Sequence, residues 1–246
     1  MTGTDAGNYS YNTAAGAAAT IFPRTITVTA DAKGKPFAAP DPPFTYQLTV
    51  GSLVSGEAFS GALTRVPGEA VGTYPIQRGT LQAGDNAGGN YAMTFVDGVL
   101  TIGKWYLRGY YQPVGEPNSI ITAPGTAAPI VGPGTIWNLI KGGNTVPLKF
   151  NVFNGVGGTE QQTVAAAFGA TGGFAAYQLP TCSGGYTDDE VPLSDLSTGG
   201  TELRYDGTQF IQNWKTPKVT GADICYRAVV TTRDGSTITA FFKVRK

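Results

Sequence analysis

The sequence offers few side chains of the types that carry out catalysis or bind transition metals. It contains no histidine, which excludes a Ser/His/Asp triad, a Cys/His dyad and a histidine-ligated zinc site. The only cysteines are Cys182 and Cys225, and two thiolates without histidine are too few to hold a metal ion. Mechanisms that use a carboxylate pair, a lysine or a tyrosine stay open, but we expect a protein that is not an enzyme.

Carboxylates are densest at Asp188, Asp189 and Glu190, with Asp195 nearby. Their oxygens are of the type that calcium prefers, which makes the first three weak calcium candidates. They lack the spacing of a calcium-binding loop, however, and no two acids stand out as the facing pair that a glycosidase needs. We therefore expect no metal site and no cofactor.

Lysine chemistry is a further alternative. An intramolecular isopeptide bond joins a lysine to an asparagine or aspartate beside a buried acid, and the sequence singles out no such triplet. Lys149 lies in strand-like sequence. We therefore expect its aliphatic stem to cover apolar surface, and we do not expect its amine to act as a nucleophile.

Aromatic residues gather in the middle of the chain, and they admit two interpretations. They could stack on sugar rings as a glycan-binding platform, or they could fill a core or the seam between two domains, where they bury a large area. Their position between two strand-rich halves favours the seam and leaves glycan stacking as the alternative. The candidates are Trp105, Tyr106, Tyr110, Tyr111 and Trp137.

The composition indicates many short strands joined by tight turns. Glycine contributes 35 residues and proline 16, and only 14% of the residues are charged, against about 25% in an ordinary soluble domain. Lys+Arg and Asp+Glu both number 17, so no net charge attracts a nucleic acid or an anionic membrane. We expect neither partner, and no long helix.

The sequence leaves two cellular locations open for this chain. The sequence contains no run of about 18 apolar residues, the length that a membrane-spanning helix needs. Residues 1–7 lack the basic and apolar parts of a signal peptide. The chain is therefore either a cytosolic protein or an internal piece of a longer secreted chain, and its composition favours the second.

Alternating apolar and polar side chains predict strands at residues 25–30, 44–50, 91–96 and 99–102. Asp-Gly pairs between such runs indicate hairpins. Three hairpins are expected, which together predict an antiparallel all-β chain. They lie at Asp97-Gly98, at Asp206-Gly207 between residues 201–205 and 208–214, and at Asp234-Gly235 between residues 224–233 and 236–244.

An internal repeat suggests tandem domains. The sequence of residues 7–21 resembles that of residues 89–102, at an offset of about 80 residues, which is too long for a solenoid turn and suits separate small domains. We expect residues 1–22 to be the closing hairpin of a preceding domain. In a longer chain the body of that domain would hold the hairpin; if the chain begins at Met1, we expect the hairpin to pair with a neighbouring subunit in a head-to-tail filament. Chance similarity of two glycine-rich hairpins is the alternative.

Residues 23–103 resemble an MBG domain of bacterial surface proteins. The resemblance rests on the Ile-Thr-Val-Thr-Ala run at residues 26–30, the Pro-Asp-Pro-Pro run at 40–43, Gly-Thr-Tyr-Pro-Ile at 72–76 and the Gly-Asn-Tyr run at 89–91. Residues 33–37 depart from it, because members commonly carry a Tyr-Gly pair there. The resemblance implies a small β-grasp-like domain strung in tandem, although the periodicity equally permits an immunoglobulin-like one.

Residues 104–246 resemble the PxKF domain of secreted bacterial proteins. The family motif corresponds to Pro147, Leu148, Lys149 and Phe150, and similar runs occur at residues 109–114, 142–146, 205–214 and 240–243. The resemblance implies an immunoglobulin-like β-sandwich without a catalytic role and, since such modules are exported, a disulfide between Cys182 and Cys225. Residues 115–135, rich in glycine, proline and alanine, are expected to form one extended surface loop.

Together these observations predict a non-catalytic structural module of a bacterial cell-surface or filament-forming protein, such as a stalk or adhesin. Its partners would be neighbouring β-modules of the same or an identical chain. The alternative is a glycan- or protein-binding tip module of a secreted adhesin or enzyme.

Overall fold

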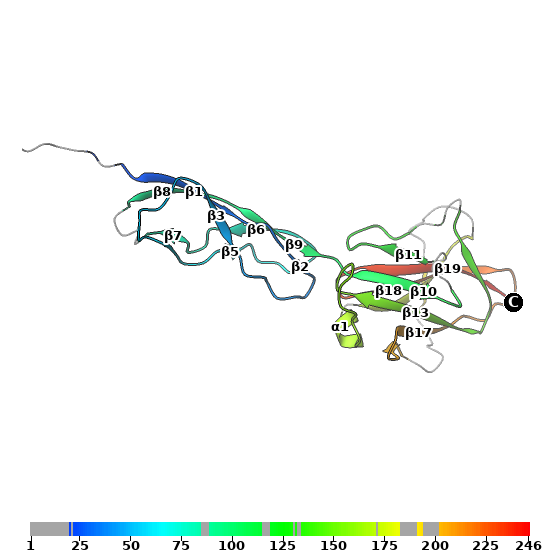
Figure 1. Ribbon diagram of the computed structural model, residues 1–246. Coiled ribbons are helices and arrows are strands. Elements are labelled where there is room, and N and C mark those ends of the chain that lie inside the picture. The colour runs from blue at the N-terminus through cyan, green and yellow to red at the C-terminus, as the bar shows by residue number, and fades with distance from the viewer. Residues whose placement is uncertain are drawn as a thin grey trace, which may run out of the picture.

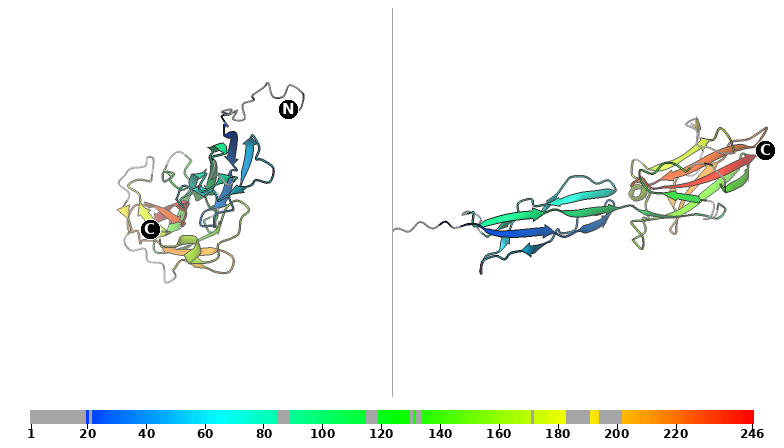
Figure 2. Two further views of the ribbon diagram at one scale, coloured as in Figure 1. Left: turned by 90° about the vertical axis from the view of Figure 1, so that its left-hand side faces the viewer. Right: turned by 90° about the horizontal axis from the view of Figure 1, so that it is seen from above.

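The computed structural model describes residues 20, 22–84, 89–114, 119–129, 131, 134–170, 172–182, 191–193 and 202–246. This part of the chain is nearly all β-structure, with mostly antiparallel sheets, which confirms the predicted fold class. Its strands fall into two groups, which lie end to end in an elongated molecule (Figures 1 and 2). We call them the N-terminal strand group, residues 24–103, and the C-terminal strand group, residues 105–246.

The N-terminal strand group contains three small sheets. Their strand orders are β3-β1-β8, β2-β9-β6-β5 and β4-β7. The strands are β1 (Arg24–Ala30), β2 (Lys33–Pro36), β3 (Tyr46–Val50), β4 (Phe59–Ser60), β5 (Thr64–Arg65), β6 (Gly72–Gln77), β7 (Gln82–Ala83), β8 (Tyr91–Val96) and β9 (Gly98–Gly103).

The C-terminal strand group is built from two larger sheets, in the orders β10-β13-β17-β16 and β11-β19-β18-β14-β15, with β12 also paired to β19. One short helix, α1 (Val164–Phe168), accompanies them. The strands are β10 (Tyr106–Tyr111), β11 (Ser119–Thr122), β12 (Trp137–Lys141), β13 (Thr145–Phe153), β14 (Gly173–Gln178), β15 (Val191–Pro192), β16 (Arg204–Tyr205), β17 (Phe210–Lys215), β18 (Ile224–Thr231) and β19 (Thr237–Arg245).

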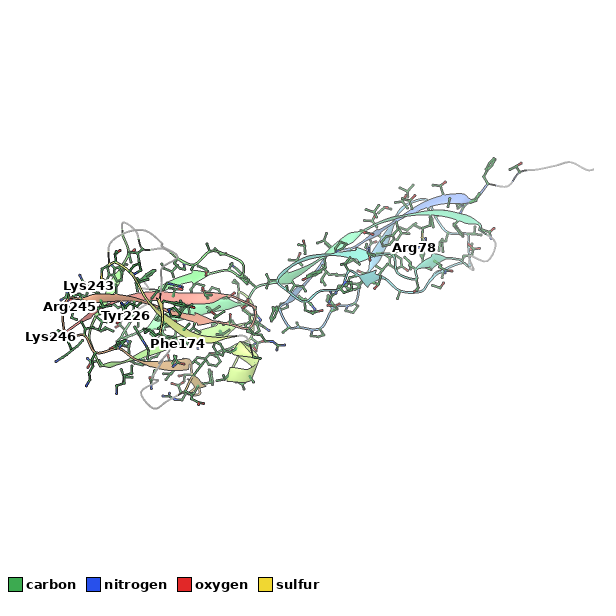
Figure 3. The ribbon with its side chains drawn as sticks, turned by 180° about the vertical axis from the view of Figure 1, so that it is seen from behind. Arg78, Phe174, Tyr226, Lys243, Arg245 and Lys246 are labelled. Carbon is green, nitrogen blue, oxygen red and sulfur yellow. A yellow bond between two sulfur atoms is a disulfide. The ribbon has the colours of Figure 1, made fainter. Side chains whose placement is uncertain are left out.

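The main core lies between the two larger sheets. Alternate side chains of β13 point inward, so Leu148, Phe150 and Val152 are fully buried. They pack with other large side chains such as Trp214 and Tyr226, and Figure 3 shows Tyr226 and Phe174 inside this group. Burial of this many large aromatic and aliphatic side chains is the main favourable term that holds the two sheets together.

The hairpin expected at Asp97-Gly98 is wrong. β8 pairs in parallel with β1, β9 pairs in parallel with β2, and the two successive strands belong to different sheets. Gly98 serves a close backbone approach instead of a turn, because a Cβ there would lie 2.8 Å from the carbonyl oxygen of Ala30. Asp-Gly pairs mark hairpins only where the glycine supplies a positive φ, and Gly98 does not have one.

The other two hairpins are confirmed. β16 and β17 are antiparallel neighbours, and so are β18 and β19. Gly207 and Gly235 have φ angles of 103° and 85°, which a residue without a Cβ adopts at little cost. Their aspartates stabilise both turns by accepting hydrogen bonds, as in the bonds from the Thr208 and Gln209 amides to Asp206 Oδ1 at 2.9 and 3.0 Å.

The prediction of one extended surface loop over residues 115–135 is also wrong in the part that the structure describes. β11 lies within this range and pairs antiparallel with β19, and Val131 is buried. Main-chain hydrogen bonds allow a strand to form without an apolar face, and both Ile120 and Ile121 are half exposed. The glycine and proline content of the range concealed this edge strand.

Candidate functional site

The joint between the two strand groups is the most distinctive site in the described structure. Trp105 lies two residues after the end of β9 and is only 4% exposed. Its indole ring meets the ring of Phe37 edge to face, with centroids 5.5 Å apart, and its Nε1 donates to the Phe37 carbonyl at 3.2 Å. The Phe37 amide in turn donates to the Gly103 carbonyl at 2.9 Å. Phe37 also packs against the cores of both strand groups.

A buried carboxylate holds the other side of the joint. Asp234, in the β18–β19 turn, is 7% exposed, and its Oδ2 accepts the backbone N–H of Trp105 at 2.7 Å. The same carboxylate accepts bonds from the Thr232 hydroxyl at 2.6 Å and from the Ser236 amide and hydroxyl at 3.0 and 2.8 Å. Because charge-assisted hydrogen bonds are strong, Asp234 ties the chain at Trp105 to the C-terminal strand group.

Next to the joint, a cluster of four charged side chains anchors the loop that carries Phe37. Lys35 on β2 is 7% exposed, and its Nζ lies 2.7 Å from both Asp41 Oδ1 and Glu69 Oε2. Arg65 at the end of β5 donates from Nε to Asp41 Oδ2 at 2.6 Å and also contacts Glu69. Its Nη1 donates to the Gly68 carbonyl at 2.6 Å. The cluster therefore joins β2, β5 and the loops that follow them.

The charge states in this cluster favour ion pairs. Hydrogen bonds from Arg65 and then Lys35 hold the pKa of Asp41 below its ordinary value, and those from Lys35 and then Arg65 do the same for the pKa of Glu69. Burial lowers the pKa of Lys35, but its bonds to Asp41 and Glu69 together raise that pKa above the ordinary value. An isopeptide bond would need a neutral lysine amine and a protonated carboxyl, which is the opposite arrangement.

The only two cysteines form a disulfide, as expected. Cys182 and Cys225 are bonded, with their Cα atoms 5.4 Å apart. The bond joins the segment that follows β14 to β18. It belongs to a small apolar cluster, which includes Trp137, Leu179 and Phe241. Among the described residues, it is the only disulfide bond.

The structure does not bring the predicted aromatics together on one surface. Trp105 lies at the joint, and Tyr110 is fully buried in the core, where its hydroxyl donates to the Ile238 carbonyl at 2.9 Å and burial raises its pKa well above the ordinary value. Tyr106 packs on Phe153, Tyr111 donates to Asn151 at 2.6 Å and Trp137 packs on Phe241.

The motif residues lie on β13 in the expected alternation. Leu148 and Phe150 point into the core, and Pro147 and Lys149 are half-buried. The weak calcium candidates Asp188, Asp189 and Glu190, like the hairpin expected over residues 1–22 apart from its last residues, lie outside the described residues. Among the residues that are described, no group of three or more acidic, cysteine or histidine side chains could hold a metal ion.

Sequence reasoning missed Asp234 and the four-residue charge cluster. The sequence predicts Asp234 only as part of a turn, and the cluster combines residues from distant parts of the sequence. One sequence signal did point to the cluster: the residues around Lys35 are those that depart from the MBG pattern.

No helix within the described ranges is long and apolar enough to cross a membrane.

Comparison with known families places the N-terminal strand group. A search of curated proteins found no match to this chain. The family model of the MBG domain (YGX type) matches residues 26–101, a range that runs from β1 to β9. The match does not extend to the C-terminal strand group, for which the PxKF resemblance stays a prediction. Residues 26–101 are thus similar to the MBG domain, a module type of bacterial surface proteins.

Proposed function

We propose that this protein is a non-catalytic structural module of a secreted bacterial surface protein, and that it serves as part of a stalk or filament. The observation that carries the proposal is the joint. A stalk must keep successive domains in line, and buried contacts from Phe37, Trp105 and Asp234 restrict bending between the two strand groups.

Two further observations support an extracellular location. Residues 26–101 match a module type of bacterial surface proteins, and disulfides such as Cys182–Cys225 form and persist in oxidising compartments. The alternative, a glycan-binding tip module, needs exposed aromatic rings that share a surface. The burial of Trp105 and Tyr110 removes two of the five candidates from such a platform.

Surface labelling of intact bacteria tests the proposal. An antibody against the chain should stain cells that produce the parent protein without permeabilisation, and protease added outside the cells should remove the signal. Staining that requires permeabilisation would contradict the proposal. A glycan array and a screen of glycosidase and peptidase substrates address the other classes: saturable glycan binding lost on Trp137→Ala would favour the tip module, and turnover would favour an enzyme.

A further inference from the structure

The C-terminal strand group has an incomplete strand edge on one side. β13 spans Thr145–Phe153, but β10 pairs only with residues 149–153 of it. Within the described ranges no strand therefore lies beside residues 145–148 on that side, while β17 occupies the other side. Thr145 and Val146, at the start of this stretch, line a cavity of about 500 Å³ whose walls also include the β12 residues 137–141.

The walls of this cavity suit an extended peptide of low charge. The buried side chains of Val114, Val146 and Phe242 form its apolar part, and Ile140 of β12 adds to it. Among the lining residues Lys141 is the only one that carries a charge. The groove also offers polar side chains, such as Asn144 and Thr145, and an open strand edge beside such a groove is the arrangement by which proteins bind a peptide as an additional strand.

The chain itself contains a segment of matching chemistry. No charged residue occurs between Asp5 and Arg24. Tyr9 and Tyr11 alternate with small polar residues, and the run from Ala14 to Ala19 consists of alanine and one glycine. Such a segment can enter a narrow groove in extended form, because alternate side chains point to opposite faces of a strand. Asp5 precedes it and has a charge complementary to that of Lys141.

The groove and the start of β1 lie at opposite ends of the molecule. Lys141 pairs with Arg245, and Figure 3 shows Arg245 and Lys246 at the end remote from the N-terminal strand group. Arg24, where β1 starts, pairs with Tyr91 at the start of β8, and β8 and β9 run from there toward the joint. β1 therefore starts at the end of the molecule that lies away from the groove (Figure 2).

We propose that residues 6–22 of one copy add as a strand beside residues 145–148 of a second copy. This inference rests on the proposed structural role and names the partner and the acceptor site. The two surfaces in contact differ, so the contact does not close on itself and each added copy presents a new groove. The product is a head-to-tail chain of copies.

Disulfide trapping between two full-length variants tests this contact. Tyr11→Cys is converted to a mixed disulfide with thionitrobenzoate, so that it reacts only with a free thiol of another molecule, and is then mixed with Thr145→Cys. The matched control replaces Thr145→Cys by Val156→Cys, which lies outside the groove at a position 89% exposed. We expect at least a tenfold higher yield of cross-linked dimer with Thr145→Cys, and suppression of that yield by a synthetic peptide of residues 5–22.

Equal yields with the two partners, or no effect of the peptide, would overturn the proposal. If Thr145→Cys does not fold, Leu139→Cys on β12, at a site 55% exposed, takes its place. Adding Ile140→Lys to the acceptor should reduce the yield at least fivefold, whereas Ile140→Val should retain it, with equal near-ultraviolet circular dichroism as the fold control. A failed cross-linking experiment would overturn the strand addition between copies but would not change the result of surface labelling of cells. The two proposals can therefore fail separately.

Discussion

At the scale of single residues, Asp234 connects the strand groups through one carboxylate. It accepts hydrogen bonds from Trp105, Thr232 and Ser236, and all of these groups are buried at the joint. Because an unsatisfied buried donor loses its bond to water as well as its protein partner, removal of such an acceptor costs more than the net value of one hydrogen bond.

We expect Asp234→Ala to lower the free energy of unfolding of the C-terminal strand group by about 1–3 kcal/mol. Urea titration followed by tryptophan fluorescence measures the change. Asp223→Ala is the matched control, since Asp223 forms only partly exposed ion pairs with Lys243 and Arg245 at 3.4 and 3.6 Å, for which we expect about 0–1 kcal/mol. Equal losses in the two variants would contradict this role of Asp234.

The charge cluster predicts a dependence of stability on acid. The pKa values of Asp41 and Glu69 are lowered in the folded protein, so on acidification the unfolded state binds protons first, and the stabilisation present at neutral pH is lost as the pH falls through and below the ordinary carboxyl range. Lys35→Met removes a shared partner. Urea midpoints measured from pH 7 to pH 3 should therefore fall less steeply in Lys35→Met, and an unchanged slope would contradict the assignment.

At the scale of elements, the passage from β8 to β9 depends on one glycine. Any side chain at Gly98 would meet the Ala30 carbonyl oxygen at 2.8 Å and the Ala30 Cβ at 3.0 Å. By contrast, a Cβ at Gly103, at the other end of β9, would meet nothing closer than 3.7 Å. The same strand thus supplies a crowded glycine and an uncrowded one.

We expect Gly98→Ala to destabilise the N-terminal strand group by about 1–3 kcal/mol through overpacking. Gly103→Ala should be neutral or slightly stabilising, because alanine reduces the conformational entropy of the unfolded chain. Thermal unfolding measured by circular dichroism compares the two. A Gly98→Ala variant as stable as the wild type would show that the β8–β9 passage tolerates a shift of β1.

The disulfide stabilises the connection between β14 and β18. It closes a sequence separation of 43 residues, for which the chain-entropy model gives about 4 kcal/mol. Reduction should lower the urea midpoint of the C-terminal strand group while leaving that of the N-terminal group unchanged. Mass spectrometry without reductant should find two hydrogens fewer than in the reduced chain, and free thiols in the unfolded native protein would contradict the bond.

At the scale of the whole molecule, the proposed structural role depends on how firmly the two strand groups keep their orientation. Phe37 contacts both cores, and the loop that follows it is anchored by the ion pairs of Asp41. Bending at Gly103 would separate the rings of Phe37 and Trp105 and expose both, and the hydrophobic effect opposes such exposure.

We expect a narrow distance distribution between spin labels at Val50→Cys and Val156→Cys, which are 55% and 89% exposed and lie in different strand groups. Phe37→Ala should broaden it, because the ring contact at the joint is lost. Tyr106→Ala, beside the joint but packed on Phe153, is the control and should leave the width unchanged. Pulsed electron resonance measures these widths, and equal widths in all three proteins would contradict a joint held by Phe37.

Local sequence determined which segments form strands and turns more than it determined which strands pair. Alternation predicted β1, β3, β8 and β9, and two of three Asp-Gly pairs predicted true hairpins, because strand faces and turn conformations depend on neighbouring residues. Residues 26–101 also carried enough of the MBG pattern to be identified, and the all-β class followed from the same local signals.

Tertiary structure alone decided which strands pair and which side chains meet. Gly98 has the residue type of a turn, but its neighbour Ala30 lies far away in the sequence, so no local pattern could reveal the close approach. For the same reason Asp234 and Trp105 could not be matched in advance, nor Lys35 with Glu69. Local sequence fixes the conformations open to each segment, whereas pairing and burial depend on contacts between distant segments.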